Sequence, residues 1–175
     1  IMAGYYGAPE ETLKAQRNLW FHTGDFGNRD AEGWLWFSGR AADRIRRRAE
    51  NISAHDIEHA ASGAPGIQES AAIGVPSGFD SDDDILLCVL VAPGAAAPAP
   101  LAVLERLAGK LPHHMLPRYI RVMDEFPRSA TGKIRKDLLK RSFVPAATWD
   151  RQAEGISVRG LYGAEAGEEA RASPE

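Results

Sequence analysis

Residues 85–92 read ILLCVLVA, a continuous apolar run with the length of one strand. A run without polar alternation is typical of a strand that is covered on both faces, so it predicts the centre of a sheet. Cys88 lies inside this run and is expected to be buried in the core, where a thiol packs as a small hydrophobic group. It is the only cysteine in the chain and therefore has no internal disulfide partner.

Strand and helix patterns alternate around this run. Residues 68–75 and 119–123 read as strands, and leucines at helical spacing predict a helix over residues 101–111. Shorter helices are expected from Ser53 to about Ala61 and over residues 134–141. Strands interleaved with helices over residues 44–142 predict a small α+β domain.

The two ends of the chain read differently from this domain. Residues 9–16 predict a short helix that begins with proline and two glutamates, and residues 29–37 predict a polar turn followed by an aromatic strand. The end of the chain is rich in Gly, Ala and Glu, and we expect disorder from about residue 164.

Composition excludes some classes of function. The 175 residues suffice for one domain, or for a small domain attached to a piece of another. A net charge of −3 gives no overall attraction to nucleic acid or to an anionic membrane. No apolar stretch is long enough to span a bilayer and no signal peptide is visible, which favours the cytoplasm. The start at Ile1 is interpreted as a break in a longer protein or a partial gene.

Residues 127–135 read PRSATGKIR and place a lysine directly after a Thr-Gly turn. Gly132 can adopt a positive φ, and Lys133 is then a flexible point charge suited to phosphate or carboxylate oxygens. Taken alone, the motif is equally typical of a solvated turn before a helix.

Other polar groups each have two interpretations. Asp25 follows a Gly turn, where a carboxylate can bind a vicinal diol or satisfy local backbone N–H groups. Arg40 can present its planar fork to ribose and phosphate oxygens, or form a surface ion pair with Asp43. Glu58 is expected to face outward from its helix or to brace the neighbouring loop.

Two further patterns argue against other binding classes. The basic run at residues 44–48 raises a nucleic-acid alternative, but no aromatic platform accompanies it, so we expect a solvated strand face. The five histidines have no recognisable metal-ligand spacing, and no metal site is expected. His113 and His114 are interpreted as an exposed helix end.

Four motifs occur in a fixed order, at residues 23–25, 39–46, 50–58 and 131–133. Together they resemble the C-terminal part of the adenylate-forming superfamily, which comprises acyl-CoA synthetases, peptide-synthetase adenylation domains and firefly-type luciferases. The resemblance covers about residues 1–145. Within the superfamily, the chain is most similar to ligases of the crotonobetaine/carnitine-CoA type, through RRAENIS (47–53), LPRYI (116–120), DEFP (124–127), WDR (149–151) and GI (155–156).

The resemblance implies a domain organisation. Residues 1–42 would be the β-rich end of a large N-terminal AMP-binding domain. Residues 43–145 would be the mobile C-terminal domain, with a short mixed sheet flanked by helices, and residues 146–175 a partly disordered tail. Asp43 matches the hinge at which this domain rotates.

The resemblance also implies site residues. Lys133 would act in adenylation, Asp25 would hold the ATP ribose, and Arg40 would lie near the nucleotide. Arg48, Ala49, Glu50 and Asn51 would form the loop that lines the CoA tunnel. Ala49 is a departure, because the family usually has Gly there; if the backbone requires a positive φ, Ala costs about 1 kcal/mol and would slow thioester formation.

The implied function is that of a C-terminal fragment of an ATP-dependent carboxylate–CoA ligase. Its substrates would be ATP with Mg²⁺, CoA and a carboxylic acid that this sequence does not identify. The phosphate loop, the acyl pocket and the Mg²⁺-binding glutamate would lie in a missing N-terminal domain, so the chain alone is expected to be inactive. A peptide-synthetase tail and a non-catalytic docking module remain alternatives.

Overall fold

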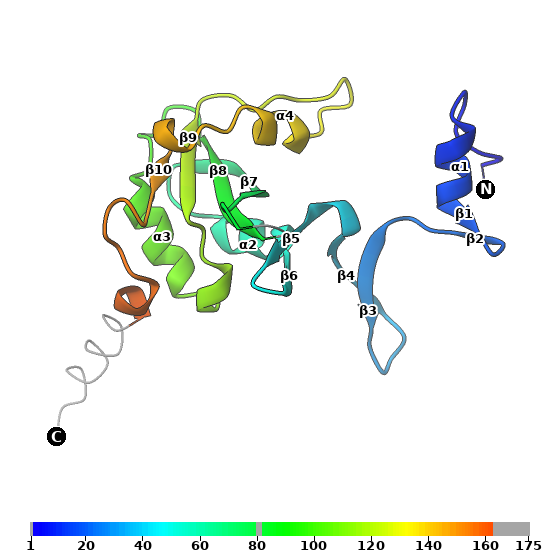
Figure 1. Ribbon diagram of the computed structural model, residues 1–175, viewed down its shortest axis with the longest axis horizontal. Coiled ribbons are helices and arrows are strands. Elements are labelled where there is room, and N and C mark those ends of the chain that lie inside the picture. The colour runs from blue at the N-terminus through cyan, green and yellow to red at the C-terminus, as the bar shows by residue number, and fades with distance from the viewer. Residues whose placement is uncertain (1, 80–81, 163–175) are drawn as a thin grey trace. The chain divides into compact units, whose positions relative to one another are not determined.

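The computed structural model describes residues 2–79 and 82–162 (Figure 1). The chain forms two compact units, residues 1–43 and residues 44–175, with the boundary between Asp43 and Arg44. No helix within the described ranges has the length and apolarity that crossing a membrane requires.

The second unit is built on a four-stranded sheet in the order β10-β9-β8-β7. Its strands are β7 (Ile67–Pro76), β8 (Asp83–Val91), β9 (Tyr119–Met123) and β10 (Trp149–Asp150). β8 pairs antiparallel with β7 and parallel with β9, and β10 is antiparallel to β9. The apolar run at residues 85–92 therefore lies at the centre of a mixed sheet, and the predicted α+β fold is confirmed.

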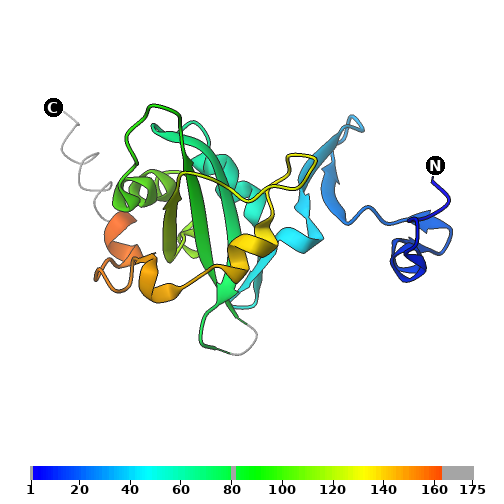
Figure 2. The same ribbon diagram turned by 90° about the horizontal axis from the view of Figure 1, so that it is seen from above.

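Alternate side chains of β8 enter two separate hydrophobic clusters, because successive residues of a strand face opposite sides of the sheet. Leu87 and Val89 pack on the face covered by α2 (Ala54–Ala61) and α3 (Pro100–Ala108). Leu86 and Cys88 pack on the opposite face, where α4 (Lys136–Arg141) lies (Figure 2). Cys88 is fully buried as predicted, and desolvation raises the pKa of its thiol to about 11.

A short hairpin opens the second unit. It consists of β5 (Arg44–Arg47) and β6 (Glu50–Ser53), joined by Arg48 and Ala49. Both turn residues have positive φ, 50° and 66°, as a two-residue hairpin loop whose twist matches that of its strands requires.

The sheet continues past residue 145, where the sequence predicts the start of a tail. The short 3-10 helix Pro145–Ala147 leads into β10, where Trp149 pairs with Ile120 and Asp150 with Tyr119. Beyond β10, Arg151 is 4% exposed, and its guanidinium donates to the Ile156 carbonyl at 2.8 Å. Residues 163–175, which include the predicted disorder, lie outside the described residues.

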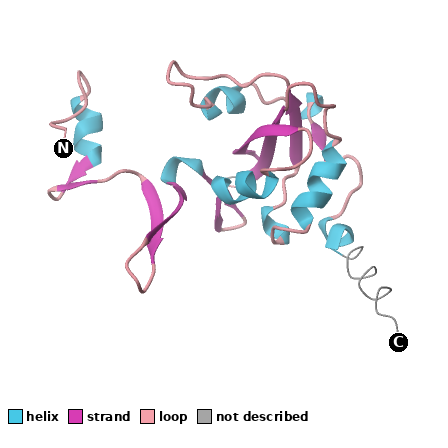
Figure 3. Cartoon of the chain, turned by 180° about the vertical axis from the view of Figure 1, so that it is seen from behind, coloured by secondary structure: helices cyan, strands magenta, loops and turns pink. Residues whose placement is uncertain are grey.

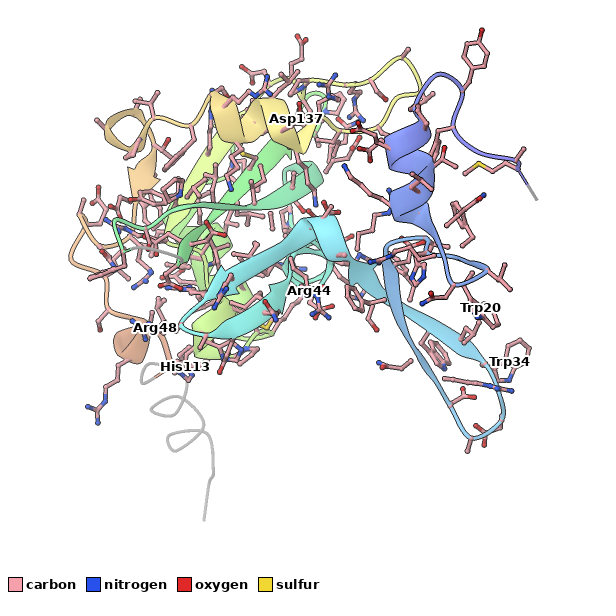
Figure 4. All side chains as sticks on the ribbon, turned by 45° about the vertical axis from the view of Figure 1, so that its right-hand side comes forward. Trp20, Trp34, Arg44, Arg48, His113 and Asp137 are labelled. Atoms are coloured by element: carbon pink, nitrogen blue, oxygen red, sulfur yellow. The ribbon has the colours of Figure 1, made fainter. Side chains whose placement is uncertain are left out.

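The first unit consists of a helix and two hairpins whose strands pair with their neighbours in sequence. The helix α1 (Pro9–Ala15) is followed by the hairpin β1 (Gln16–Arg17)–β2 (Trp20–Phe21) and by the hairpin β3 (Asp25–Arg29)–β4 (Leu35–Arg40) (Figure 3). A 3-10 helix, Ala41–Asp43, ends the unit. Among residues 2–43, no hydrophobic side chain is buried, and Trp34 projects from the loop end of its hairpin (Figure 4).

Candidate functional site

The Lys133 loop, residues 128–134, is an ordered turn between β9 and α4. Arg128 and Ile134 form an isolated antiparallel bridge that closes it. The Ser129 amide donates to the Lys133 carbonyl at 2.8 Å, and the Gly132 amide donates to the Ser129 carbonyl at 2.9 Å. Gly132 has a φ of 80°, which confirms the predicted use of glycine at this turn.

Lys133 differs from the other cations of residues 128–136, because each of those is in an ion pair. Arg128 is paired with Glu69, Arg135 with Asp137, and Lys136 with Glu58, each at 2.7 Å. The Lys133 side chain is exposed, and its ammonium has no ion-pair partner among residues 2–79 and 82–162. The loop thus presents one uncommitted ammonium group on a hydrogen-bonded turn.

Two of the paired cations, Arg128 and Lys136, anchor this segment to the rest of the domain. Glu58 accepts a hydrogen bond from the Ala72 amide at 2.8 Å and also pairs with Lys136, so it connects α2, β7 and α4. Glu58 is therefore partly buried rather than facing outward, and its side-chain partners lie on β7 and α4 rather than on a neighbouring loop. The Arg135–Asp137 pair is exposed, and hydrogen bonding to Arg135 lowers the pKa of Asp137 to about 2.

Asp25 and Arg40 lie side by side in the first unit. They are register partners across β3 and β4, and the Arg40 Nε lies 3.2 Å from an Asp25 carboxylate oxygen. The Asp25 amide donates to the Thr23 hydroxyl at 3.1 Å, which fixes the turn before the strand. Both side chains reach solvent, with exposed fractions of 57% for Arg40 and 36% for Asp25. The structure thus pairs the two residues that sequence reasoning assigned to a nucleotide.

The residues predicted to line a CoA tunnel lie in the β5–β6 turn and at the start of β6. Arg48, Ala49, Glu50 and Asn51 are all exposed. The Arg48 amide donates to the Asp82 carboxylate, and the Glu50 carboxylate lies 3.2 Å from the His114 imidazole. Figure 4 shows Arg44 and Arg48 along this hairpin.

One residue of the basic run departs from the expected solvated face. Arg47 is only 8% exposed, because strand alternation directs it inward together with Ile45. Its guanidinium donates to the carbonyls of His114 at 3.0 Å and Leu116 at 2.8 Å. Burial lowers the pKa of Arg47, and its hydrogen bonds fasten the hairpin to the 3-10 helix His113–Met115 and the residue after it.

Sequence reasoning missed an ion-pair network centred on Arg118. Its guanidinium contacts Asp84 at 2.9 Å and Asp150 at 2.8 Å, and it stacks 4.8 Å from the centre of the Tyr119 ring. These hydrogen bonds raise the pKa of Arg118. The signal was present in the sequence: LPRYI and WDR each place a charged residue in or beside a short strand. The network joins β8, β9 and β10, so these motifs have a structural role here.

The arrangement that a metal site requires is not found in the part of the chain that the structure describes. Among the described residues, no group of three or more His, Cys, Asp or Glu side chains is arranged to hold a metal ion. His55 and His59 stack on successive turns of α2, with ring centroids 6.2 Å apart, and His113 packs against His114.

Comparisons with known proteins find a matching family and relatives of similar sequence. Residues 56–133 match the family described as the AMP-binding enzyme C-terminal domain. The 3-hydroxybenzoate–CoA ligase of Aromatoleum sp. (strain CIB) is 37% identical over 142 residues, which are 78% of this chain and 26% of that protein. The chain thus spans about a quarter of the length of this curated relative.

Solved structures extend the similarity to the fold. ATP-bound MatB from Rhodopseudomonas palustris has a TM-score of 0.71 and 30% identity, covering 83% of this chain and 29% of that chain. The amide bond synthetase McbA from Marinactinospora thermotolerans also has a TM-score of 0.71 and 30% identity, covering 82% of this chain and 29% of that one.

Proposed function

Because this chain belongs to the adenylate-forming superfamily and carries its AMP-binding enzyme C-terminal domain, we propose that it is the C-terminal part of an ATP-dependent carboxylate–CoA ligase. The observation that supports this most directly is the Lys133 ammonium, which is uncommitted on a hydrogen-bonded turn where Arg128, Arg135 and Lys136 are each paired. We further assign Lys133 to the adenylation half-reaction.

Adenylation brings two anions together. A carboxylate oxygen of the substrate attacks the α-phosphorus of ATP, a new P–O bond forms, and pyrophosphate leaves with the electron pair of the bond that breaks. A cation held at the forming bond stabilises the developing charge and orients both anions. Lys133 would contact oxygens of both groups, while Asp25 binds the ribose hydroxyls and Arg40 the nucleotide beside it.

Thioester formation would use another surface of the second unit. The CoA sulfur attacks the acyl carbon of the adenylate, AMP leaves, and the thiol proton is lost. The exposed turn at Arg48 and Ala49 would approach the pantetheine arm of CoA, with Glu50 and Asn51 beside it. Rotation at Asp43 would exchange this turn for Lys133, as in other enzymes where domain movement separates reaction steps. The boundary between the two compact units, after Asp43, supports this hinge.

Mg²⁺ is expected to accompany ATP in this family. Among the described residues, no group of three or more His, Cys, Asp or Glu side chains is arranged to hold a metal ion, and we assign no Mg²⁺ ligand to this chain in either step. We also propose that the chain alone is inactive.

A second candidate is a non-catalytic module that docks onto a separate polypeptide. Exposed aromatic side chains of this kind suit a protein partner. Eight aromatic residues of the first unit are at least 42% exposed: Tyr5, Tyr6, Trp20, Phe21, Phe26, Trp34, Trp36 and Phe37. A ligase in which this surface is covered by its own large domain explains the same exposure and also uses Lys133, so we favour it.

The test measures ATP–pyrophosphate exchange and CoA-thioester formation over a panel of carboxylates, using the complete polypeptide that carries this chain. Lys133→Ala should reduce exchange at least a hundredfold and leave thioester formation from supplied acyl-adenylate intact. Lys140→Ala, which removes an exposed cation from α4, is the matched control and should change neither rate. No exchange with any carboxylate, or exchange indifferent to Lys133, would favour the docking module. Amide formation with an amine in place of CoA would assign the chain to the chemistry named for McbA.

A further inference from the structure

We propose that Arg128 and Glu69 are positioning residues for the adenylation step, acting through the Lys133 loop. This inference rests on the proposed function of Lys133. Neither residue is assigned a contact with substrate, and their role is to hold the turn that carries the lysine.

Glu69 is directed toward the loop by an irregularity in β7. The β7–β8 register shifts between Ile67 and Glu69, which is the pattern of a β-bulge at Gln68, and bulges redirect the side chains that follow them. From Glu69 onward, alternation puts its carboxylate on the same face as Ala71 and Ile73. That face packs against Phe126 and Ile134, at the two ends of the segment that contains the loop, together with Leu139 of α4.

Arg128 joins Glu69 to the tip of the turn. One guanidinium nitrogen donates to the Glu69 carboxylate at 2.7 Å, and the other donates to the Gly132 carbonyl at 3.1 Å. Gly132 directly precedes Lys133, so the planar fork fixes the peptide group from which the lysine backbone continues. Within the loop, the Lys133 amide also donates to the Ser129 hydroxyl at 3.2 Å.

The exposure of this pair argues for positioning over stability. Both side chains are 37% exposed, and ion pairs that accessible contribute little to folding because water screens them. A displacement of a reacting group by about 1 Å can nevertheless slow a reaction about a hundredfold. The Arg128–Glu69 pair tethers the turn next to the proposed catalytic ammonium. It contributes little to folding stability, so its main effect is on the rate of adenylation.

The experiment compares four variants in the complete polypeptide: Glu69→Gln, Arg128→Gln, Arg128→Lys and Arg135→Gln. Arg135 is the matched control, because its pair with Asp137 is local and exposed, and its replacement removes the same charge two residues from Lys133. Glu69→Gln is decisive, because it releases Arg128 without removing any positive charge from the site. Each variant is assayed for pyrophosphate exchange, for thioester formation from supplied acyl-adenylate, and for thermal midpoint. Amide hydrogen exchange at Gly132 and Lys133 is followed in the 175-residue chain.

We expect Glu69→Gln and Arg128→Gln to reduce pyrophosphate exchange about ten- to a hundredfold, and Arg128→Lys to give an intermediate value. Thioester formation and the thermal midpoint should stay unchanged, while the Gly132 and Lys133 amides should exchange faster. Arg135→Gln should match the unmodified protein. The inference is overturned if Glu69→Gln leaves exchange unchanged, or if Arg128→Gln lowers both half-reactions together with the midpoint. No exchange in the unmodified protein with any carboxylate would overturn the proposed function, whereas normal exchange that is lost only in Lys133→Ala would overturn this inference alone.

Discussion

At the scale of single residues, the strain expected at Ala49 depends on whether its φ is positive, which only the structure could show. The turn requires a positive φ at both of its residues, and Ala49 adopts 66°. An L-residue with a Cβ is strained there by roughly 1 kcal/mol relative to glycine. The resemblance to adenylate-forming enzymes placed glycine at this position, so alanine brings both backbone strain and a methyl group to the turn proposed to approach CoA.

Replacing Ala49 with Gly should therefore stabilise the second unit by up to about 1 kcal/mol, because the strain of the turn is relieved. Thioester formation from supplied acyl-adenylate should become faster, while pyrophosphate exchange stays constant. Urea unfolding and the two half-reaction assays measure these effects. Ala102→Gly on the exposed side of α3 is the control and should destabilise by about 1 kcal/mol. An Ala49→Gly protein with an unchanged thioester rate would show that the methyl group does not obstruct CoA.

At the scale of elements, short segments far apart in sequence are held in place by arginines. β10 has only two residues, yet Arg118 connects it to β8 through Asp150 and Asp84, and the Arg118 carbonyl accepts the Arg151 amide at 3.0 Å. Arg47 likewise holds the β5–β6 hairpin in place, because its buried guanidinium donates hydrogen bonds to two backbone carbonyls distant in sequence. Charged hydrogen bonds thus replace the apolar area that such short strands lack.

Asp150→Asn should destabilise the second unit by about 2 kcal/mol at pH 7, because it weakens the charged hydrogen bonds to Arg118. Burial alone would raise the pKa of Asp150, but the hydrogen bonds from Arg118 lower it in the folded state. Their contribution is complete above the pKa of an unfolded aspartate, about 3.9, and is lost as pH falls through the folded value. The stability difference between the two proteins, measured by urea unfolding, should therefore shrink below about pH 4. Asp137→Asn is the control: because its ion pair is exposed, it should leave the midpoint of urea unfolding unchanged. A loss of stability in Asp150→Asn that stays constant down to pH 3 would contradict this account.

The elements that could be predicted from sequence are those with a strong local pattern. The apolar run at residues 85–92, the leucine spacing of α3 and the residues of β9 all gave the observed element types, with boundaries within three residues. Contacts between segments distant in sequence could not be predicted from such local patterns. β10 is too short to show the alternation of a strand, and Arg47 is buried only because distant carbonyls accept its hydrogen bonds. For the candidate site, sequence located the Lys133 turn, but the partner of Arg128 lies 59 positions away.

At the scale of the whole molecule, the two units differ in how they bury apolar surface. The second unit contains two clusters, on opposite faces of its sheet, with β8 contributing to both. Among residues 2–43, no hydrophobic side chain is buried, and their strands form isolated two-stranded hairpins. Such hairpins are marginal in water, so the first unit has no source of stability of its own within the described residues. Its exposed aromatic side chains fit the proposal that a large adenylation domain covers them.

Removing residues 1–43 should consequently leave a protein that folds as well as the complete chain. We expect residues 44–175 to unfold in one cooperative thermal transition, with a midpoint within about 4 °C of the 175-residue chain, the shift that a change of about 1 kcal/mol would produce. Residues 1–43 alone should show no cooperative transition, because they have no core to lose. Circular dichroism at 222 nm follows both. Loss of the transition on removing residues 1–43 would mean that this segment contributes to the core of the second unit, and the division after Asp43 would then not mark a hinge between independently stable parts.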